Sequence, residues 1–283
     1  MKVSEIMTHF QQRGTWVNWK RSCDRVLFGA PDGTVTKAAV AWKPTWNNLK
    51  RAVELGCDLF ITHEPLYIAE KNEYEIWMGG SVNSYDQKIQ EIPVDEEDVW
   101  VKKREWLDKQ NLTVIRCHDF WDDFPDIGIH GAWAKFLGFN GKPINSMKFY
   151  ETHSVEGLSL IQLVKKIQQK CKEIGQNIVH YIGNPEMSVH KIALGTGAIT
   201  HYRIMHYELE ADVLVLTDDG TRLWESAQWA EDANIGLIIV NHATAEEPGI
   251  RYLAEYMKSQ FPNIDFSLIE GGCLYRSVGE QNF

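Results

Sequence analysis

The chain has 283 residues, of which 44% are hydrophobic and 24% are charged, and its formal net charge at pH 7 is −10. A chain of this length can bury a sizeable core, and the length allows one large domain or two interleaved lobes. The acidic balance argues against nonspecific nucleic-acid binding, which needs a basic surface.

The five cysteines are widely spaced and include no Cys-x-x-Cys pair, a pattern typical of buried thiols in a reducing compartment. The first residues lack the pattern of a signal peptide, and no long apolar run follows them. We therefore expect a soluble protein of the cytoplasm that has no membrane partner.

Strands and helices alternate along the first half of the chain. Thr45 is a candidate N-cap and Gly56 a candidate C-cap for the helix between two early strands, and this succession predicts a right-handed βαβ unit with parallel strands. Residues 67–98 have no clear period and are interpreted as a long loop or an insertion that forms a lid. The expected elements are a helix over 1–12, a loop over 13–33 with a short apolar run at 26–28, strands over 36–42, 58–62 and 111–117, and helices over 46–55, 99–110 and 130–137.

The second half repeats this alternation. A turn-rich stretch at 140–145 is the expected boundary between two lobes, residues 1–140, with an insertion near 68–98, and residues 141–283. The fold class is therefore α/β, with two similar interleaved lobes that have mixed sheets and form one compact unit. The expected elements are helices over 159–174, 221–233 and 247–260, and strands over 178–182, 191–194, 212–216, 235–240 and 265–269.

Apolar strands end on residues of metal-ligand type at four places. In open α/β sheets, ligands bind beyond the carboxyl ends of the strands, so we expect these ends to converge on one cleft. Three histidines with several carboxylates could hold two divalent cations, and such ligands suit Zn, Mn, Fe or Co better than Ca. The pairs are His63 with Glu64, His118 with Asp122, Asp218 with Asp219, and His242 with Glu246.

The spacing within two of these pairs supports a shared site. His242 and Glu246 share one helix face if the turn after the preceding strand is already helical, and Pro248 suits a first helical turn. His118 and Asp122 have the same separation. Taken singly, each pair has an alternative interpretation as a capping carboxylate beside a solvated histidine, but the four strand ends together favour a metal site.

The turn Gly195-Thr-Gly-Ala198 admits two interpretations. Its amides could cradle a phosphate, but the chain lacks the complete phosphate-loop patterns here, so a tight reversal of the strand is favoured. His201 and His206, which follow this turn, are interpreted as surface or core histidines.

Five short motifs carry a resemblance to a known family. They are Thr62-His-Glu-Pro-Leu66; His118 with Asp122 and Ala134-Lys-Phe-Leu-Gly138; Ala193-Leu-Gly-Thr-Gly-Ala198; Asp212 to Asp219; and Asn241-His242 with Glu246, Gly249-Ile250 and Leu253. In these motifs, and along nearly the whole chain, the sequence resembles the Nif-three-like family of dinuclear-metal-centre proteins, often labelled GTP cyclohydrolase I type 2-like.

This resemblance implies a site and an assembly. Glu246 would bridge two divalent metal ions (Zn, Mn or Fe), and Asp219 would lie at the rim of the site. The resemblance also implies a toroidal homohexamer whose metal pairs face an inner cavity. The metal ligands it implies are His63, Glu64, Asp122, His242 and Glu246, with His118 nearby as a sixth candidate.

The chain departs from the family pattern at three places. Glu64 replaces the second histidine of a His-His pair, which hardens the site, favours Mn or Fe over Zn and raises the chance that one metal binds weakly. Thr217-Asp-Asp219 replaces Thr-Gly followed by an acid, and the segment after Tyr67 is longer than expected.

Three functional hypotheses follow. The first is a metal-dependent hydrolase in which two cations lower the pKa of a water molecule, with Asp219 or Glu64 as the candidate general base. The family label suggests a nucleotide or another phosphorylated small molecule as its substrate. The second hypothesis is a hexamer that binds, delivers or senses metal, or acts as a scaffold, without turnover. The third is an α/β protein with solvated carboxylates and no metal.

Overall fold

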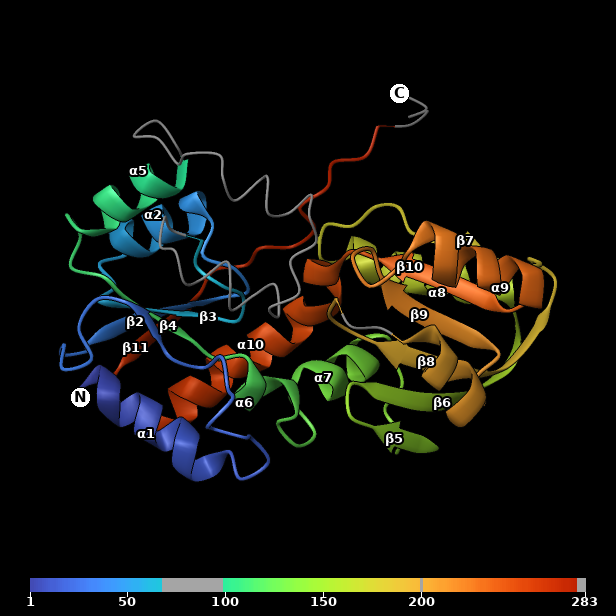
Figure 1. Cartoon of the computed structure of the whole chain (residues 1–283), viewed down its shortest axis with the longest axis horizontal. Helices are drawn as coiled ribbons and strands as arrows, with labels where there is room; N and C mark the ends of the chain where they lie inside the picture. The colour runs from blue at the N-terminus through green and yellow to red at the C-terminus, as the bar shows by residue number, and fades with distance from the viewer. Residues whose placement is uncertain (68–98, 199–200, 279–283) are drawn as a thin grey trace, which may run out of the picture.

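The computed structural model describes residues 1–67, 99–198 and 201–278 of the chain, which form two mixed sheets flanked by helices. Figure 1 shows the two sheets side by side, with α7 (Ile129–Phe136) and α10 (His242–Gln260) between them. The predicted α/β class is confirmed. The insertion predicted near residues 68–98 lies outside the described residues.

The first sheet has the strand order β1-β4-β3-β2-β11. Its strands β2, β3 and β4 are parallel, which confirms the predicted βαβ unit, and β1 pairs antiparallel with β4. The last strand of the chain, β11, pairs in parallel with β2, so the part of the chain after residue 141 also contributes to the first sheet. The strands are β1 (Val26–Phe28), β2 (Lys37–Ala41), β3 (Leu59–Thr62), β4 (Thr113–Arg116) and β11 (Asp265–Leu268).

The second sheet has the strand order β5-β6-β8-β9-β10-β7. Strands β8, β9 and β10 are parallel, and antiparallel strands form both edges. Strands β5 and β6 were not predicted, because polar residues such as Thr152 and His153 are buried in β6 and obscure its pattern. The strands are β5 (Asn145–Met147), β6 (Tyr150–Ser159), β7 (His180–Ile182), β8 (Ser188–Gly195), β9 (Val213–Thr217) and β10 (Gly236–Val240).

Helices cover both faces of the first sheet. In β3, Leu59 and Ile61 pack in the core that contains α1 and α10, whereas Phe60 packs in the core on the α2 side. The Thr45 side chain accepts a hydrogen bond from the Asn48 backbone N–H at 3.2 Å, which confirms the predicted N-cap of α2. The remaining helices are α1 (Val3–Arg13), α2 (Trp46–Glu54), α5 (Val99–Leu107), α6 (Asp119–Asp122), α8 (Leu160–Lys172) and α9 (Gln228–Ala233), with π-helical turns η1 (Ile204–Glu208) and η2 (Leu223–Ala227).

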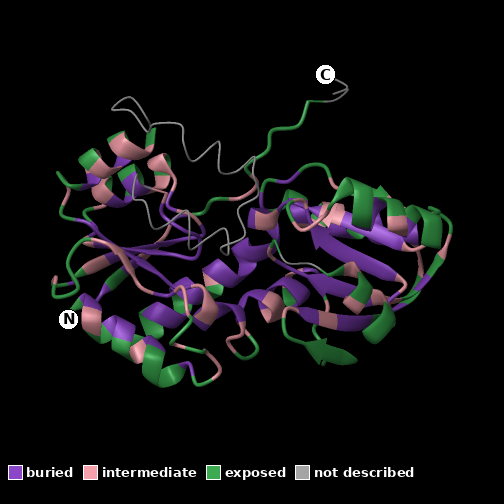
Figure 2. Ribbon diagram, viewed as in Figure 1, coloured by how far each residue is buried: buried purple, intermediate pink, exposed green. Residues whose placement is uncertain are grey.

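Helix α10 connects the second sheet to the first. It was predicted from residue 247, but it begins at His242, directly after β10. Pro248 therefore lies beyond the first turn, which corrects the sequence expectation. Figure 2 shows that much of α10 is buried between the two sheets. None of the described helices is long and apolar enough to cross a membrane.

Candidate metal centre

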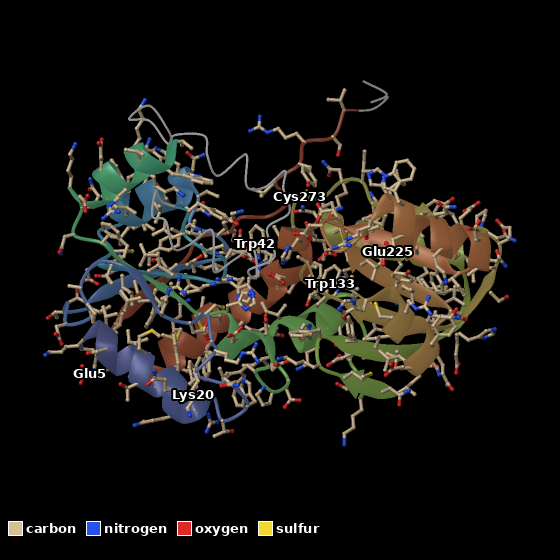
Figure 3. All side chains as sticks on the ribbon, in the orientation of Figure 1. Glu5, Lys20, Trp42, Trp133, Glu225 and Cys273 are labelled. Atoms are coloured by element: carbon tan, nitrogen blue, oxygen red, sulfur yellow. The ribbon has the colours of Figure 1, made fainter. Side chains whose placement is uncertain are left out.

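The predicted ligand residues meet where three elements end or begin. His63 and Glu64 follow β3, Asp122 ends α6, and His242 and Glu246 lie in the first turns of α10. Of these five residues, all except His242 are buried. Trp42, which is labelled in Figure 3, lies beside this cluster, and its indole N–H donates to Glu246 Oε2 at 2.7 Å.

The orientation of His63 is fixed from outside the cluster. Its Nδ1 lies 3.1 Å from the Cys117 carbonyl oxygen, and a carbonyl only accepts, so Nδ1 carries the proton. Nε2 then faces the cluster, 3.3 Å from Asp122 Oδ1 and 3.4 Å from Glu246 Oε2, and in the neutral imidazole it would present a lone pair there. This nitrogen is buried and has no hydrogen-bond partner among the described residues. A lone pair aimed at two carboxylates fits a cation placed between them.

His242 has the complementary arrangement. Its Nδ1 lies 2.8 Å from Asp219 Oδ2, and its Nε2 lies 2.9 Å from Glu246 Oε1 and 3.5 Å from Glu64 Oε1. A carboxylate on the second ring nitrogen commonly orients a histidine ligand. Since one oxygen of Glu246 faces His63 and the other faces His242, Glu246 occupies a bridging position.

His118 and Asp122 complete the cluster. His118 Nδ1 lies 3.2 Å from Asp122 Oδ2, and the His118 ring stacks on that of His63 with a centroid distance of 4.3 Å. The ligand atoms form two groups, and within each group the atoms lie within 4.8 Å of one another. The first group comes from His63, Glu64 and His118, and the second from Glu64, His242 and Glu246. Glu64 belongs to both groups. These imidazole and carboxylate groups could bind metal, although they define neither its identity nor its number.

Charges within the cluster compensate one another. Burial alone would raise the pKa values of Asp122 and Glu246, but the neighbouring histidines hold both below their usual range. Burial would lower the pKa of His242, but the carboxylates of Glu246, Asp219 and Glu64 raise it to about 11. Cations would therefore replace protons on the histidines, and binding should weaken on acidification.

The cluster forms one wall of a cavity of about 610 Å³. Several residues that line the cavity were not predicted as site residues. Arg116 precedes the ligands at the end of β4; its Nε donates to the His63 carbonyl oxygen at 3.0 Å, and its Nη2 lies 3.9 Å from Glu64 Oε2. The other unpredicted polar or aromatic residues of the wall include Trp16, Arg21, His130, Lys148, Phe149 and Thr196.

The sequence could have indicated only some of these cavity-lining residues. Arg116 lies two positions before His118 in a predicted strand, so the strand-end argument could have included it. Lys148 and Phe149 lie between β5 and β6, which the sequence did not reveal.

Asp219 and the glycine-rich turn lie at the edge of the cluster. Asp219 contacts His242 but does not line the cavity. Gly197 has φ +76°, a conformation that L side chains rarely adopt, and its carbonyl oxygen accepts the Thr217 hydroxyl at 2.6 Å. A Cβ at Gly197 would lie 3.6 Å from Glu246 Oε1, so the turn borders the cluster. His201 is exposed, and His206 Nδ1 bonds the Ala211 carbonyl oxygen.

Comparison with known proteins supplies the family. The sequence profile of the Duf34/NIF3 family (NGG1p interacting factor 3) matches residues 93–270, more than half of the chain. The chain belongs to the DUF34/NIF3 family. A curated relative in Clostridium perfringens, named GTP cyclohydrolase 1 type 2 homolog, is 22% identical over 273 residues, which cover 92% of each chain.

Solved structures show that this DUF34/NIF3 protein shares its fold with bacterial proteins. A Staphylococcus aureus hypothetical protein has a TM-score of 0.73 at 18% identity, with 98% of this chain and 99% of the other covered. A Bacillus cereus protein related to NIF3 has the same TM-score and coverage at 12% identity. At such identities the likeness shows the fold alone.

Proposed function

We propose that the cluster is a dinuclear metal centre of a cytoplasmic, metal-dependent hydrolase that acts on a nucleotide or another phosphorylated small molecule. The buried His63 Nε2, which faces two carboxylates and has no hydrogen-bond partner among the described residues, is the observation that carries the metal centre. The proposed ligands are His63, Glu64, Asp122, His242 and Glu246, with His118 as a sixth.

The cavity supports a phosphorylated substrate. Arg21, Arg116 and Lys148 bring positive charge to a lining that also contains five carboxylates, which bound cations would offset, and guanidinium groups bind phosphate through paired hydrogen bonds. The volume of about 610 Å³ lies within the range typical of small-molecule pockets. The name of the Clostridium perfringens relative points to the same substrate class.

The residues of the chain would have distinct roles in hydrolysis. Two divalent cations, when bound, lower the pKa of a water molecule and stabilise negative charge on the substrate. Asp219 holds the His242 ring through Nδ1, so it acts as a positioning residue rather than a base. Glu64 lines the cavity and remains the candidate general base.

A second candidate function is a non-catalytic hexamer that binds or delivers metal. It is favoured by the number of protein ligands around the cluster, since structural sites are closed and catalytic sites keep an open position. We propose a homohexamer for both candidate functions. Light scattering of the purified protein tests it.

Elemental analysis of protein purified without chelator tests the metal centre. We expect at least about two equivalents per chain, and a His242→Ala variant should lose those held by the dinuclear centre. His190→Ala is the matched control, because His190 is an exposed histidine of β8 outside the cluster. Less than half an equivalent in the wild-type protein would refute the metal centre.

A screen of nucleotides and phosphoesters with the metal-loaded protein then tests hydrolysis. Turnover that disappears in His242→Ala and persists in His190→Ala supports the hydrolase. Full metal content without turnover on any phosphorylated compound would favour the second candidate.

A further inference from the structure

A third group of ligand atoms lies beside the candidate metal centre. Cys23, His118 and Asp119 each offer one ligand atom, and these atoms lie within 4.8 Å of one another. We call them the Cys23 cluster. His118 and Asp119 also line the cavity, and Cys23 is partly exposed and in no disulfide.

The Cys23 cluster converges on one oxygen. Asp119 Oδ1 lies 3.6 Å from Cys23 Sγ and 3.2 Å from His118 Nδ1. The other oxygen of the same carboxylate accepts the Cys23 backbone N–H at 3.1 Å. A thiol, an imidazole nitrogen and a carboxylate oxygen therefore surround a common point.

Hydrogen bonds in both directions fix this arrangement. The Asp24 carboxylate accepts backbone N–H bonds from His118, Asp119 and Phe120 at the start of α6. The Asp119 side chain in turn holds the backbone of Cys23. Because the loop and the helix position each other, Cys23 is held beside His118 by the fold rather than by a flexible surface contact.

The same geometry argues against a catalytic thiol. In a nucleophilic triad, the nucleophile and the orienting carboxylate contact opposite nitrogens of the histidine. Here the Cys23 thiol and His118 Nδ1 face the same oxygen of Asp119. The side chains thus converge as ligands do, instead of forming a proton relay.

We propose that Cys23, His118 and Asp119 form a further metal site, adjacent to the dinuclear centre and sharing His118 with it, that takes a divalent cation such as Zn²⁺, Fe²⁺ or Co²⁺. Thiolate and imidazole ligands suit these borderline ions, whereas Mg²⁺ and Ca²⁺ require oxygen ligands. On binding, the Cys23 thiol transfers its proton to solvent and coordinates as thiolate, without any change in oxidation state.

The shared histidine links this site to the dinuclear centre. His118 Nδ1 lies 3.2 Å from Asp119 Oδ1 and equally far from Asp122 Oδ2. One nitrogen coordinates one cation at a time, so Nδ1 serves either the Cys23 cluster or the pairing with Asp122. The Cys23 cluster therefore holds its cation next to the dinuclear centre and competes for one of its candidate ligands.

Titration of reduced, chelator-stripped protein with Co²⁺ under argon tests the proposal. Thiolate coordination gives a charge-transfer absorption band in the near ultraviolet that imidazole and carboxylate ligands do not produce. We expect this band in the wild-type protein and its loss in Cys23→Ser. Cys273→Ser is the matched control, because Cys273 is the other partly exposed cysteine of the described chain, and it should keep the band.

Two further variants keep the outcomes distinct. His242→Ala removes a ligand of the proposed dinuclear centre but should retain the band. The Cys23 site can therefore be tested even if the proposed dinuclear hydrolase is wrong. Asp119→Asn should lower the Co²⁺ affinity, measured by titration of the charge-transfer band, at least about tenfold. This variant provides a test if Cys23→Ser does not fold. Absence of the band in saturated wild-type protein, or an equal band in folded Cys23→Ser, would overturn the proposal.

Discussion

Two histidines of the candidate metal centre have one ring nitrogen fixed by an oxygen outside the ligand group. The Cys117 carbonyl holds His63 Nδ1, and the Asp219 carboxylate holds His242 Nδ1. The Cys117 group is a backbone carbonyl, which substitution does not remove, whereas the Asp219 group is a side-chain carboxylate, which substitution can change. Asp219 is therefore the residue through which the orientation of a ligand can be altered without removing that ligand.

Replacing Asp219 by Asn should weaken metal binding about 10- to 100-fold, the usual effect of losing such an orienting partner. The amide has no negative charge to support the lone pair of His242 Nε2, although every proposed ligand remains. Competition with a chromophoric chelator measures the affinity. Asp232→Asn, an exposed acid of α9, is the control.

The result also separates positioning from catalysis. A positioning residue shifts the metal affinity, and addition of excess metal should restore most of the turnover. If Asp219→Asn binds metal like the wild-type protein and yet has lost turnover, Asp219 acts on the substrate and the role assigned to it here is wrong.

Helix α10 aligns two of the proposed ligands because it begins at His242. With the helix already formed at that point, His242 and Glu246 lie one turn apart on one face. Further along, α10 packs tightly on α7. A Cβ at Gly249 would lie 2.6 Å from Ile129 Cδ1 and 2.9 Å from Ile129 Cα, so only glycine permits this approach.

Gly249→Ala should therefore lower the free energy of unfolding by about 1–3 kcal/mol, the usual cost of overpacking a core. Gly141→Ala is the matched control, since a Cβ there meets nothing within 4 Å, and it should change stability by less than about 0.5 kcal/mol. Urea unfolding followed by circular dichroism measures both. Equal stability of the two variants would mean that α7 and α10 are not packed as closely as described.

At the scale of the whole molecule, the proposed ligands come from both halves of the structure. His63 and Glu64 follow β3 of the first sheet, whereas His242 and Glu246 follow β10 of the second. Bound cations would link the two sheets at the buried start of α10. Since unfolding would separate these ligands, metal binding and global stability should be coupled.

Metal should therefore raise the melting temperature of chelator-stripped protein. At a free concentration 100 times the dissociation constant, one site adds about 2.7 kcal/mol of stability. Scanning calorimetry with and without Zn²⁺ or Mn²⁺ measures the shift, which His242→Ala should reduce, since it retains only the Cys23 cluster, and which His190→Ala should keep. An unchanged melting temperature in the wild-type protein with both metals would contradict the coupling.

Local patterns predicted much of the fold and the members of the candidate centre. Thr45 and Gly56 marked a helix, and the apolar run before Thr62 marked a strand buried on both faces. The prediction of secondary structure failed at β6 and at the start of α10, where polar residues are buried. Strand β6 buries Thr152 and His153, and the first turn of α10 contains polar residues that belong to the cluster.

The sequence by itself determined the α/β alternation and placed ligand-type residues at the strand ends, because periodicity, caps and breakers act over a few neighbouring residues. Only the tertiary structure decided which side chains meet. It brought Trp42 against Glu246, Cys23 beside His118, and β11 back to the first sheet. It also turned His63 Nε2 inward through the Cys117 carbonyl. These contacts join residues far apart in the sequence, so they depend on the packing of whole elements.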